Sequence, residues 1–200
     1  MTFDPITIFA ILAAFALGGT LKGATGAGAP IITIPVIAAF YDVRIAVIIM
    51  VIPNLLTNIS QIYQFRKTIL PILFTFSFAL GGGIGAFVGT ILLINLPIKI
   101  LTLSVAFIVI IYITLKLIVP SWKLAYQRAT KLVFIMGAGG GVLQGSAGLS
   151  APVSITFLNS MKLERNQFIP TISVYFGVMS LFQIPTCLLY TSPSPRDEKV

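Results

Sequence analysis

Two glycine-rich segments interrupt the long apolar runs of this chain, and the second is a copy of the first. GGTLKGATGAGAPIITIP spans Gly18–Pro35, and GGGVLQGSAGLSAP spans Gly139–Pro152. Three pairs of residues share an offset of 122 positions: Gly23 with Gly145, Gly26 with Gly148, and Pro30 with Pro152. Glycines followed by a proline inside an apolar run are typical of a membrane helix that is broken so that its backbone lines a cavity. The duplication therefore predicts a membrane protein built from two repeated units.

Composition places the chain in the same class. Of its 200 residues, 57% are hydrophobic and 9% are charged, which leaves too few polar groups to cover a soluble domain. The first apolar run follows Asp4 rather than Lys or Arg, and similar runs come after it, so a cleaved signal peptide is not indicated. We attribute the net charge of +8 to cytoplasmic loops and not to a nucleic-acid surface. The predicted fold class is all-α, a polytopic integral membrane protein.

Apolar runs long enough to cross a bilayer fill the first unit, residues 1–120. Residues 6–40 form either one crossing broken at the glycines or a crossing followed by a re-entrant half-helix. Three further spans are predicted at Ile45–Tyr63, Ile69–Ile94 and Ile100–Val119. Residues 121–131 form a basic cytoplasmic connector, and residues 132–186 form an incomplete second unit.

Two topologies follow from the alternatives for residues 6–40. If this segment is a single broken pass, each unit has an even number of passes, the amino terminus lies in the cytoplasm, and the two units are parallel. If the half-helix is an extra crossing, the number of passes is odd and the units are inverted. We favour the even count and therefore the parallel repeat.

The last residues differ in character from the rest of the chain. Residues 187–200 are polar and rich in Pro and Ser, and CLLYTSPSPRD resembles translated adapter sequence, so we interpret them as a non-native tail. The offset of 122 positions also places the end of a complete second unit well beyond residue 200. We therefore expect a longer native chain.

The two breaks are the candidate substrate site. Backbone amides lose their i−4 partners there, and the positive end of the half-helix that begins at Pro30 or Pro152 can hold an oxyanion. Glycine permits a positive φ and close approach of a ligand, and hydroxyls beside the breaks supply further donors. The alternative is that the small residues serve only close helix packing. The residues assigned to the site from the breaks are Gly23, Thr25, Gly26, Gly28, Pro30, Gly145, Ser146, Gly148 and Pro152.

Polar side chains within the spans extend this candidate site. Lys22 stands directly before the first break, where it could neutralise an anion, or it could instead extend to the membrane surface. A polar stripe on one face of the second span has partial counterparts at the offset of 122 positions, and it either lines a cavity or joins helices. These assignments add Lys22, Gln144, Asn54, Asn58, Gln61 and Gln183 to the predicted site.

Another glycine cluster and the absence of several residue types limit the possible functions. Gly81, Gly85 and Gly89 are spaced as a helix-packing ridge without a proline. The chain has one Cys and no His, which argues against a disulfide framework, a zinc site and a catalytic dyad. Outside residues 187–200, no carboxylate falls within a predicted span. We therefore expect no enzyme activity, no metal and no cofactor.

The motifs also resemble those of a known family. GATGAGAPIITIPVIA in the first half and GSAGLSAPVSITFLNSMKLERNQF in the second are similar to the sulfite exporter TauE/SafE family, over Thr2 to Thr186. Ala27 and Ser150 stand where many relatives have glycine. The resemblance implies a multi-pass protein of the bacterial or archaeal cytoplasmic membrane, with about eight helices in the full-length chain.

The resemblance also implies a function. It points to a secondary transporter of small anions, such as sulfite or related sulfur-containing or organic anions, whose partners are the solute and the lipid bilayer. The alternative is a non-transporting scaffold or assembly subunit whose glycines serve helix packing.

Overall fold

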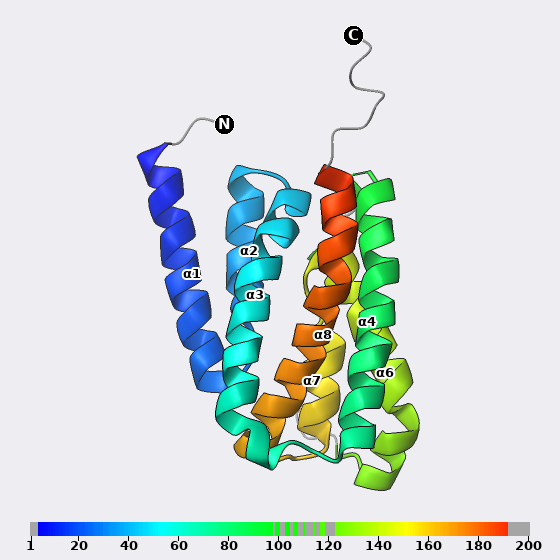
Figure 1. Cartoon of the computed structure of the whole chain (residues 1–200). Coiled ribbons are helices and arrows are strands. Elements are labelled where there is room, and N and C mark those ends of the chain that lie inside the picture. The colour runs from blue at the N-terminus through cyan, green and yellow to red at the C-terminus, as the bar shows by residue number, and fades with distance from the viewer. Residues whose placement is uncertain are drawn as a thin grey trace.

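The described part of the chain is a bundle of helices that lie side by side (Figure 1). The computed structural model describes residues 4–97 and 123–191 together with isolated positions between 99 and 118. The elements are α1 (Pro5–Thr25), α2 (Ala29–Phe40), α3 (Val43–Phe65), η1 (Arg66–Thr68), α4 (Ile72–Asn95), α6 (Tyr126–Ala147), α7 (Ala151–Ser160) and α8 (Arg165–Thr191). Four segments are long and apolar enough to cross a membrane: Pro5–Thr25, Ile45–Thr68, Ile72–Asn95 and Arg165–Pro185. The predicted all-α, polytopic membrane fold is confirmed.

The duplication is visible in the helix boundaries. α1 ends at Thr25 and α6 at Ala147, while α2 begins at Ala29 and α7 at Ala151. Each pair is 122 positions apart, which is the offset found between the glycine motifs. The helices α1, α2 and α3 therefore correspond to α6, α7 and α8.

The chain reverses at the first break, which corrects the favoured topology. Thr33 Oγ1 on α2 lies 3.4 Å from the Ala14 carbonyl oxygen on α1. A Cβ added at Gly18 would lie 2.9 Å from the carbonyl oxygen of Ala29. Because residues 29 and 33 face residues 18 and 14, α1 and α2 are antiparallel and form a hairpin. The prediction of one broken crossing is wrong, and the alternative of a re-entrant half-helix holds.

The two units are inverted relative to each other. Thr68 and Asn166 meet at one end of the α3–α8 contact, where Thr68 Oγ1 donates to the Asn166 carbonyl oxygen at 2.5 Å. Further along, Ser173 Oγ lies 3.0 Å from Gln61 Oε1. Residue numbers therefore rise on one helix as they fall on the other. Since α3 and α8 are equivalent by duplication and run antiparallel, the predicted parallel repeat is wrong.

One end of the bundle is basic, which indicates its orientation. The residues at this end are Arg66 and Lys67 of η1, Arg128 and Lys131 of α6, Lys162 between α7 and α8, and Arg165 at the start of α8. The positive-inside rule assigns this end to the cytoplasm. α1 begins at the opposite end of the bundle (Figure 1). On this orientation the start of α1 faces outward, contrary to the predicted cytoplasmic amino terminus.

Two predicted boundaries fall inside helices. α6 begins at Tyr126, so its first residues lie within the predicted connector. α8 continues to Thr191, beyond the predicted start of the tail at Cys187. The predicted fourth span, Ile100–Val119, lies largely outside the described residues.

Glycines bring α4 and α6 into backbone contact. A Cβ added at Gly85 or Gly89 would overlap the carbonyl oxygen of Ala138 or Val142 on α6. From the other helix, a Cβ added at Gly145 would overlap the Ala86 carbonyl oxygen on α4. Without side chains between them, the two helices approach closely along this contact. The packing role predicted for the ridge at Gly81, Gly85 and Gly89 is confirmed.

We expect Gly85→Ala to destabilise the protein through this contact. The new methyl group has no space beside the Ala138 carbonyl oxygen, so the helices must separate at a cost of about 1–3 kcal/mol. Thermal unfolding in detergent measures the loss. Val88→Ala is the control, because Val88 on the same helix is 45% exposed. Equal melting temperatures for the two variants would contradict the close packing.

Candidate functional site

The first break is a tight reversal between α1 and α2. Gly26 has φ 83° and donates its amide to the Lys22 carbonyl oxygen at 2.7 Å, and Gly28 has φ 105°. Such positive φ values favour glycine because a Cβ would clash with the backbone. Pro30 lies in the first turn of α2, as predicted. The Thr25 hydroxyl lies 2.6 Å from the Ala27 carbonyl oxygen, so it holds the loop.

The second break follows the same plan with one difference. Gly148 has φ 71° and donates its amide to the Gln144 carbonyl oxygen at 2.8 Å. Ser150 occupies the position of Gly28, with φ −90°, and its amide donates to Gln144 Oε1 at 3.3 Å. Ser146 donates its hydroxyl to the Val142 carbonyl oxygen at 2.7 Å. The amides of Gly26 and Gly148 thus close their own helices and are not available to a ligand.

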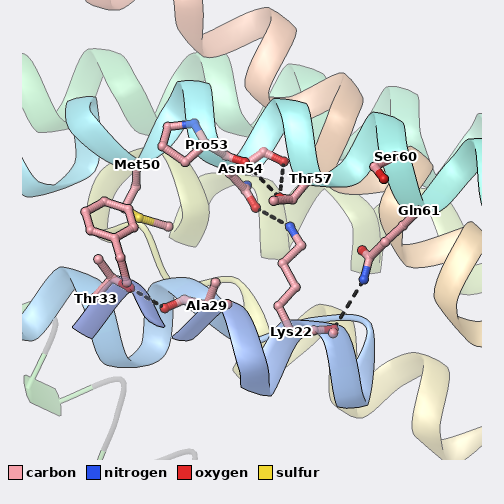
Figure 2. A pocket seen from close by; sticks show the side chains of 12 residues that line it. Lys22, Ala29, Thr33, Met50, Pro53, Asn54, Thr57, Ser60 and Gln61 are labelled. Carbon is pink, nitrogen blue, oxygen red and sulfur yellow. Dashed lines mark hydrogen bonds between the residues drawn. The ribbon is translucent and has the colours of Figure 1, made fainter. Parts of the chain in front are cut away.

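A cavity of about 270 Å³ lies between α1, α2 and α3. Figure 2 shows Lys22 crossing this space from α1 towards Asn54 on α3. The lining residues are Phe15, Gly19, Lys22, Gly23, Ala29, Thr33, Met50, Pro53, Asn54, Thr57, Ser60 and Gln61. Phe15, Met50 and Pro53 supply apolar surface, while Lys22, Asn54 and Gln61 supply polar groups. The cavity can therefore hold a small solute with one polar end.

Lys22 is buried inside the protein, with 3% of its surface exposed. Its ammonium donates to Asn54 Oδ1 at 2.7 Å and lies 5.9 Å from the ring centroid of Phe176 on α8. Both neighbours are neutral, and no carboxylate is among the described residues that line the cavity. The alternative in which Lys22 extends to the surface does not fit this burial. The cavity instead contains a positive group without a negative partner.

Gln61 connects this cavity to the second unit. Its Nε2 donates to the Lys22 carbonyl oxygen at 3.2 Å, where α1 ends. Its Oε1 lies 3.0 Å from the hydroxyl of Ser173 on α8. The same hydroxyl lies 2.7 Å from the Ile169 carbonyl oxygen. The single hydroxyl proton of Ser173 is shared between these acceptors. The end of α1 is therefore held against α8 through one amide side chain.

A second, smaller cavity lies where the two breaks meet. Its volume of about 10 Å³ is roughly the space of one water molecule. Its lining comes from both breaks and from α8: Gly28, Pro30, Ile31, Gln144, Gly148, Leu149, Ser150, Ala151, Ile155 and Phe176. We call it the inter-loop cavity. The breaks therefore meet here, and not in the larger cavity.

The structure divides the predicted site residues into three groups. The larger cavity is lined by Lys22, Gly23, Asn54 and Gln61. The inter-loop cavity is lined by Gly28, Pro30, Gln144 and Gly148. The predicted residues that line neither of these two cavities are Thr25, Gly26, Asn58, Gly145, Ser146, Pro152 and Gln183.

Two members of the last group are buried without full hydrogen bonding. Asn58 is 0% exposed, and its amide nitrogen and oxygen have no partner in the described structure. Gln183 is 1% exposed, and its amide nitrogen is likewise unpaired there. A Cβ at Gly177 on α8 would lie 4.0 Å from the Asn58 Cβ. The polar stripe on α3 therefore points partly into the larger cavity and partly against α8.

Four positions that line the larger cavity have duplicated counterparts in the inter-loop cavity. Lys22, Ala29, Thr33 and Asn54 of the larger cavity correspond to Gln144, Ala151, Ile155 and Phe176 of the inter-loop cavity. Pro53 corresponds to Tyr175, whose ring stacks on Phe78 at 4.0 Å and fills the second unit. Aromatic side chains thus close the second cavity where the first is open.

The duplicated glycines of α1 and α6 have different surroundings in the described structure. Gly141 and Gly145 of α6 are covered by α4, but a Cβ at their equivalents Gly19 and Gly23 would meet no described atom within 4 Å. Gly145 therefore serves helix packing, while Gly23 borders the cavity. Sequence equivalence did not distinguish these environments.

Three residues that matter here were not predicted. Thr57 and Ser60 line the larger cavity and lie three and six positions after Asn54, so helical periodicity could have identified them. Phe176 could have been found as the equivalent of Asn54 at the offset of 122 positions. Because it is apolar, its side chain alone did not indicate a binding site.

Two inverted units, each with a hairpin broken at glycines, enclose a buried cation, and this is the architecture of a membrane transporter. The chain belongs to the sulfite exporter TauE/SafE family, whose sequence profile matches residues 10–194. The match confirms the resemblance found in the sequence and extends past Cys187. No curated protein and no solved structure matches the chain.

Proposed function

We propose that the protein carries small, singly charged anions across the membrane and that the Lys22 ammonium binds them in the larger cavity. The anions would be hydrogensulfite, the singly charged form of sulfite, or related sulfur-containing or organic anions, in agreement with the family. The observation that carries the proposal is the burial of Lys22 beside a neutral amide, with 3% of its surface exposed. A charge inside a membrane protein is costly unless a countercharge accompanies it, and a transported anion supplies that countercharge.

The surrounding groups fit a solute with one negative charge. Thr57 and Ser60 bring hydroxyl groups to the cavity. Ala29, the first residue of α2, also borders the cavity, so the positive end of this helix lies beside it. One ammonium balances a single negative charge, whereas a second would remain unpaired in a site of low polarity.

The scaffold alternative explains only part of the site. Backbone contact between α4 and α6 accounts for Gly145 as a packing residue. It gives no reason for a lysine buried in a cavity of about 270 Å³. Anion transport explains both the cavity and its charge. We place the protein in a bacterial or archaeal cell membrane with the basic end of the bundle in the cytoplasm.

Asn54→Asp tests this proposal directly. The new carboxylate would pair with Lys22 in place of the amide oxygen that now lies 2.7 Å from the ammonium. We expect uptake of radiolabelled sulfite into proteoliposomes to fall about tenfold or more, because the neutralised ammonium no longer attracts an anion. Asn159→Asp, the same change at an exposed position of α7, should leave uptake unchanged. Wild-type uptake by Asn54→Asp would exclude Lys22 as the anion-binding group.

A further inference from the structure

We propose that Phe176 is the gate between the larger cavity and the inter-loop cavity, and that the inter-loop cavity is a second binding position for the transported anion. This inference rests on the proposed function.

Phe176 lines the inter-loop cavity and lies close to Lys22, which lines the larger cavity. It is 5% exposed, and its ring centroid lies 5.9 Å from the Lys22 ammonium. The same side chain lines the inter-loop cavity. An anion that leaves Lys22 for the inter-loop cavity therefore meets this ring.

The duplication gives Phe176 a counterpart that also contacts the ammonium. Asn54 on α3 and Phe176 on α8 are 122 positions apart, and both contact Lys22. Asn54 accepts a hydrogen bond, while Phe176 offers the face of its ring, which attracts a cation more weakly than an anion does. A bound anion can therefore replace the ring as the partner of Lys22, and the ring can move.

The inter-loop cavity has the chemistry of a closed anion site. Ser150 lines it and is 1% exposed, and its hydroxyl is buried with no hydrogen-bond partner in the described structure. Ser150 directly precedes α7, so this donor lies at the positive end of a helix. A buried hydroxyl without a partner is unfavourable, and an oxyanion would supply one. The ligand class is a small, singly charged oxyanion, since the described lining contains no charged side chain.

The inverted repeat explains why the second position is closed here. Four lining positions of the larger cavity have duplicated counterparts in the inter-loop cavity, and inverted units can exchange conformations to open one side while the other closes. The larger cavity holds about 270 Å³ and the inter-loop cavity about 10 Å³. In the exchanged conformation the inter-loop cavity would be the larger, with the Phe176 ring away from Lys22.

Ser150→Ala tests the second position. Because the hydroxyl has no partner to lose, the variant should be as stable as the wild type in thermal unfolding. Sulfite flux in proteoliposomes should fall about tenfold, as for one lost hydrogen bond to a charged ligand. Sulfite-dependent thermal stabilisation, which reports the Lys22 position, should stay unchanged. Wild-type flux in Ser150→Ala would overturn the second position.

Phe176→Leu and Phe176→Ala test the gate, with Phe168→Ala as the control. Phe168 is also a buried aromatic residue of α8, 9% exposed, but it lines neither cavity. We expect both Phe176 variants to transport methanesulfonate and ethanesulfonate several-fold faster relative to sulfite than the wild type does. The Phe168 variant should keep the wild-type ratio. Wild-type ratios in both Phe176 variants would overturn the gate, and Phe176→Leu decides if the alanine variant does not fold.

The outcomes separate this inference from the proposed function. If Lys22→Met removes sulfite-dependent stabilisation while the Phe176 and Ser150 variants behave as the wild type, the gate and second position fail and the Lys22 site stands. If Lys22→Met retains sulfite-dependent stabilisation, the proposed function fails first.

Discussion

Lys22→Met should abolish anion transport while leaving a folded protein in the membrane. Lys22 has 3% of its surface exposed. Methionine keeps the length and apolar character of the lysine stem but removes the charge. A partner lost from a buried charge pair costs about 3–5 kcal/mol, which corresponds to roughly a hundredfold or more in affinity for the anion. Flux of radiolabelled sulfite in proteoliposomes should therefore fall to the background of empty vesicles.

Thermal unfolding gives an independent measure of the same change. A ligand that binds the folded state raises its stability, so sulfite should shift the melting temperature of the wild type and not that of Lys22→Met. Lys131→Met is the matched control, because Lys131 is exposed near the start of α6. If Lys22→Met moved sulfite at the rate of this control, the buried ammonium would have no part in transport.

Gly26→Ala and Gly148→Ala should each strongly destabilise the protein. Both glycines have positive φ, 83° and 71°, which costs another residue about 1–2 kcal/mol. A Cβ at Gly26 would also lie 2.7 Å from Ile169 Cγ1 on α8, and one at Gly148 would overlap Ile34 and lie 3.1 Å from Val47 Cγ2 on α3. Together the two effects should cost about 2–4 kcal/mol for each variant.

A double substitution separates the two causes. Ile169→Ala removes the Cγ1 atom that the new methyl group would meet at 2.7 Å, so it should cost less stability in the Gly26→Ala background than in the wild type, while the backbone cost remains. Unfolding in mixed detergent micelles measures each variant. Gly139→Ala is the control, since a Cβ there would meet only Val153 at 3.9 Å and the helix gains propensity. If Gly26→Ala and Gly148→Ala were as stable as this control, the result would contradict the hairpin geometry.

The contacts of these glycines follow the duplication. Gly26 packs on Ile169 and Gly148 on Val47, and both the glycines and their partners are 122 positions apart. Each break is therefore fixed against the third helix of the other unit. Substitution of either glycine should loosen the contact between the units as well as the hairpin itself.

The duplication made much of this fold predictable. The positions of both breaks and the prolines in the first turns of α2 and α7 could be expected from the pattern of glycine, proline and apolar residues. Neither the burial of Lys22, whose position also allowed it to extend to the membrane surface, nor the direction of the chain after each break could be expected. A glycine followed by a proline is compatible with a kink or a reversal, and the hairpin depends on the contact of Thr33 with Ala14, which no local pattern specifies.

Equivalent residues also acquired different roles from their surroundings. Gly23 borders the larger cavity, but Gly145 lies against α4. Asn54 accepts a hydrogen bond from Lys22, while its equivalent Phe176 presents a ring to the same ammonium. Sequence comparison within the chain identifies such pairs, but only the packing of neighbouring helices decides what each residue does.

The central claim is that an anion binds at the buried ammonium of Lys22. Selenite, the selenium analogue of sulfite, can be located by anomalous scattering in crystals of the protein. The account predicts a selenium peak in the cavity between α1, α2 and α3, with a selenite oxygen at hydrogen-bond distance from Lys22 Nζ. A peak elsewhere in the protein, with Lys22 still bonded to Asn54 and selenite transported in vesicles, would contradict it.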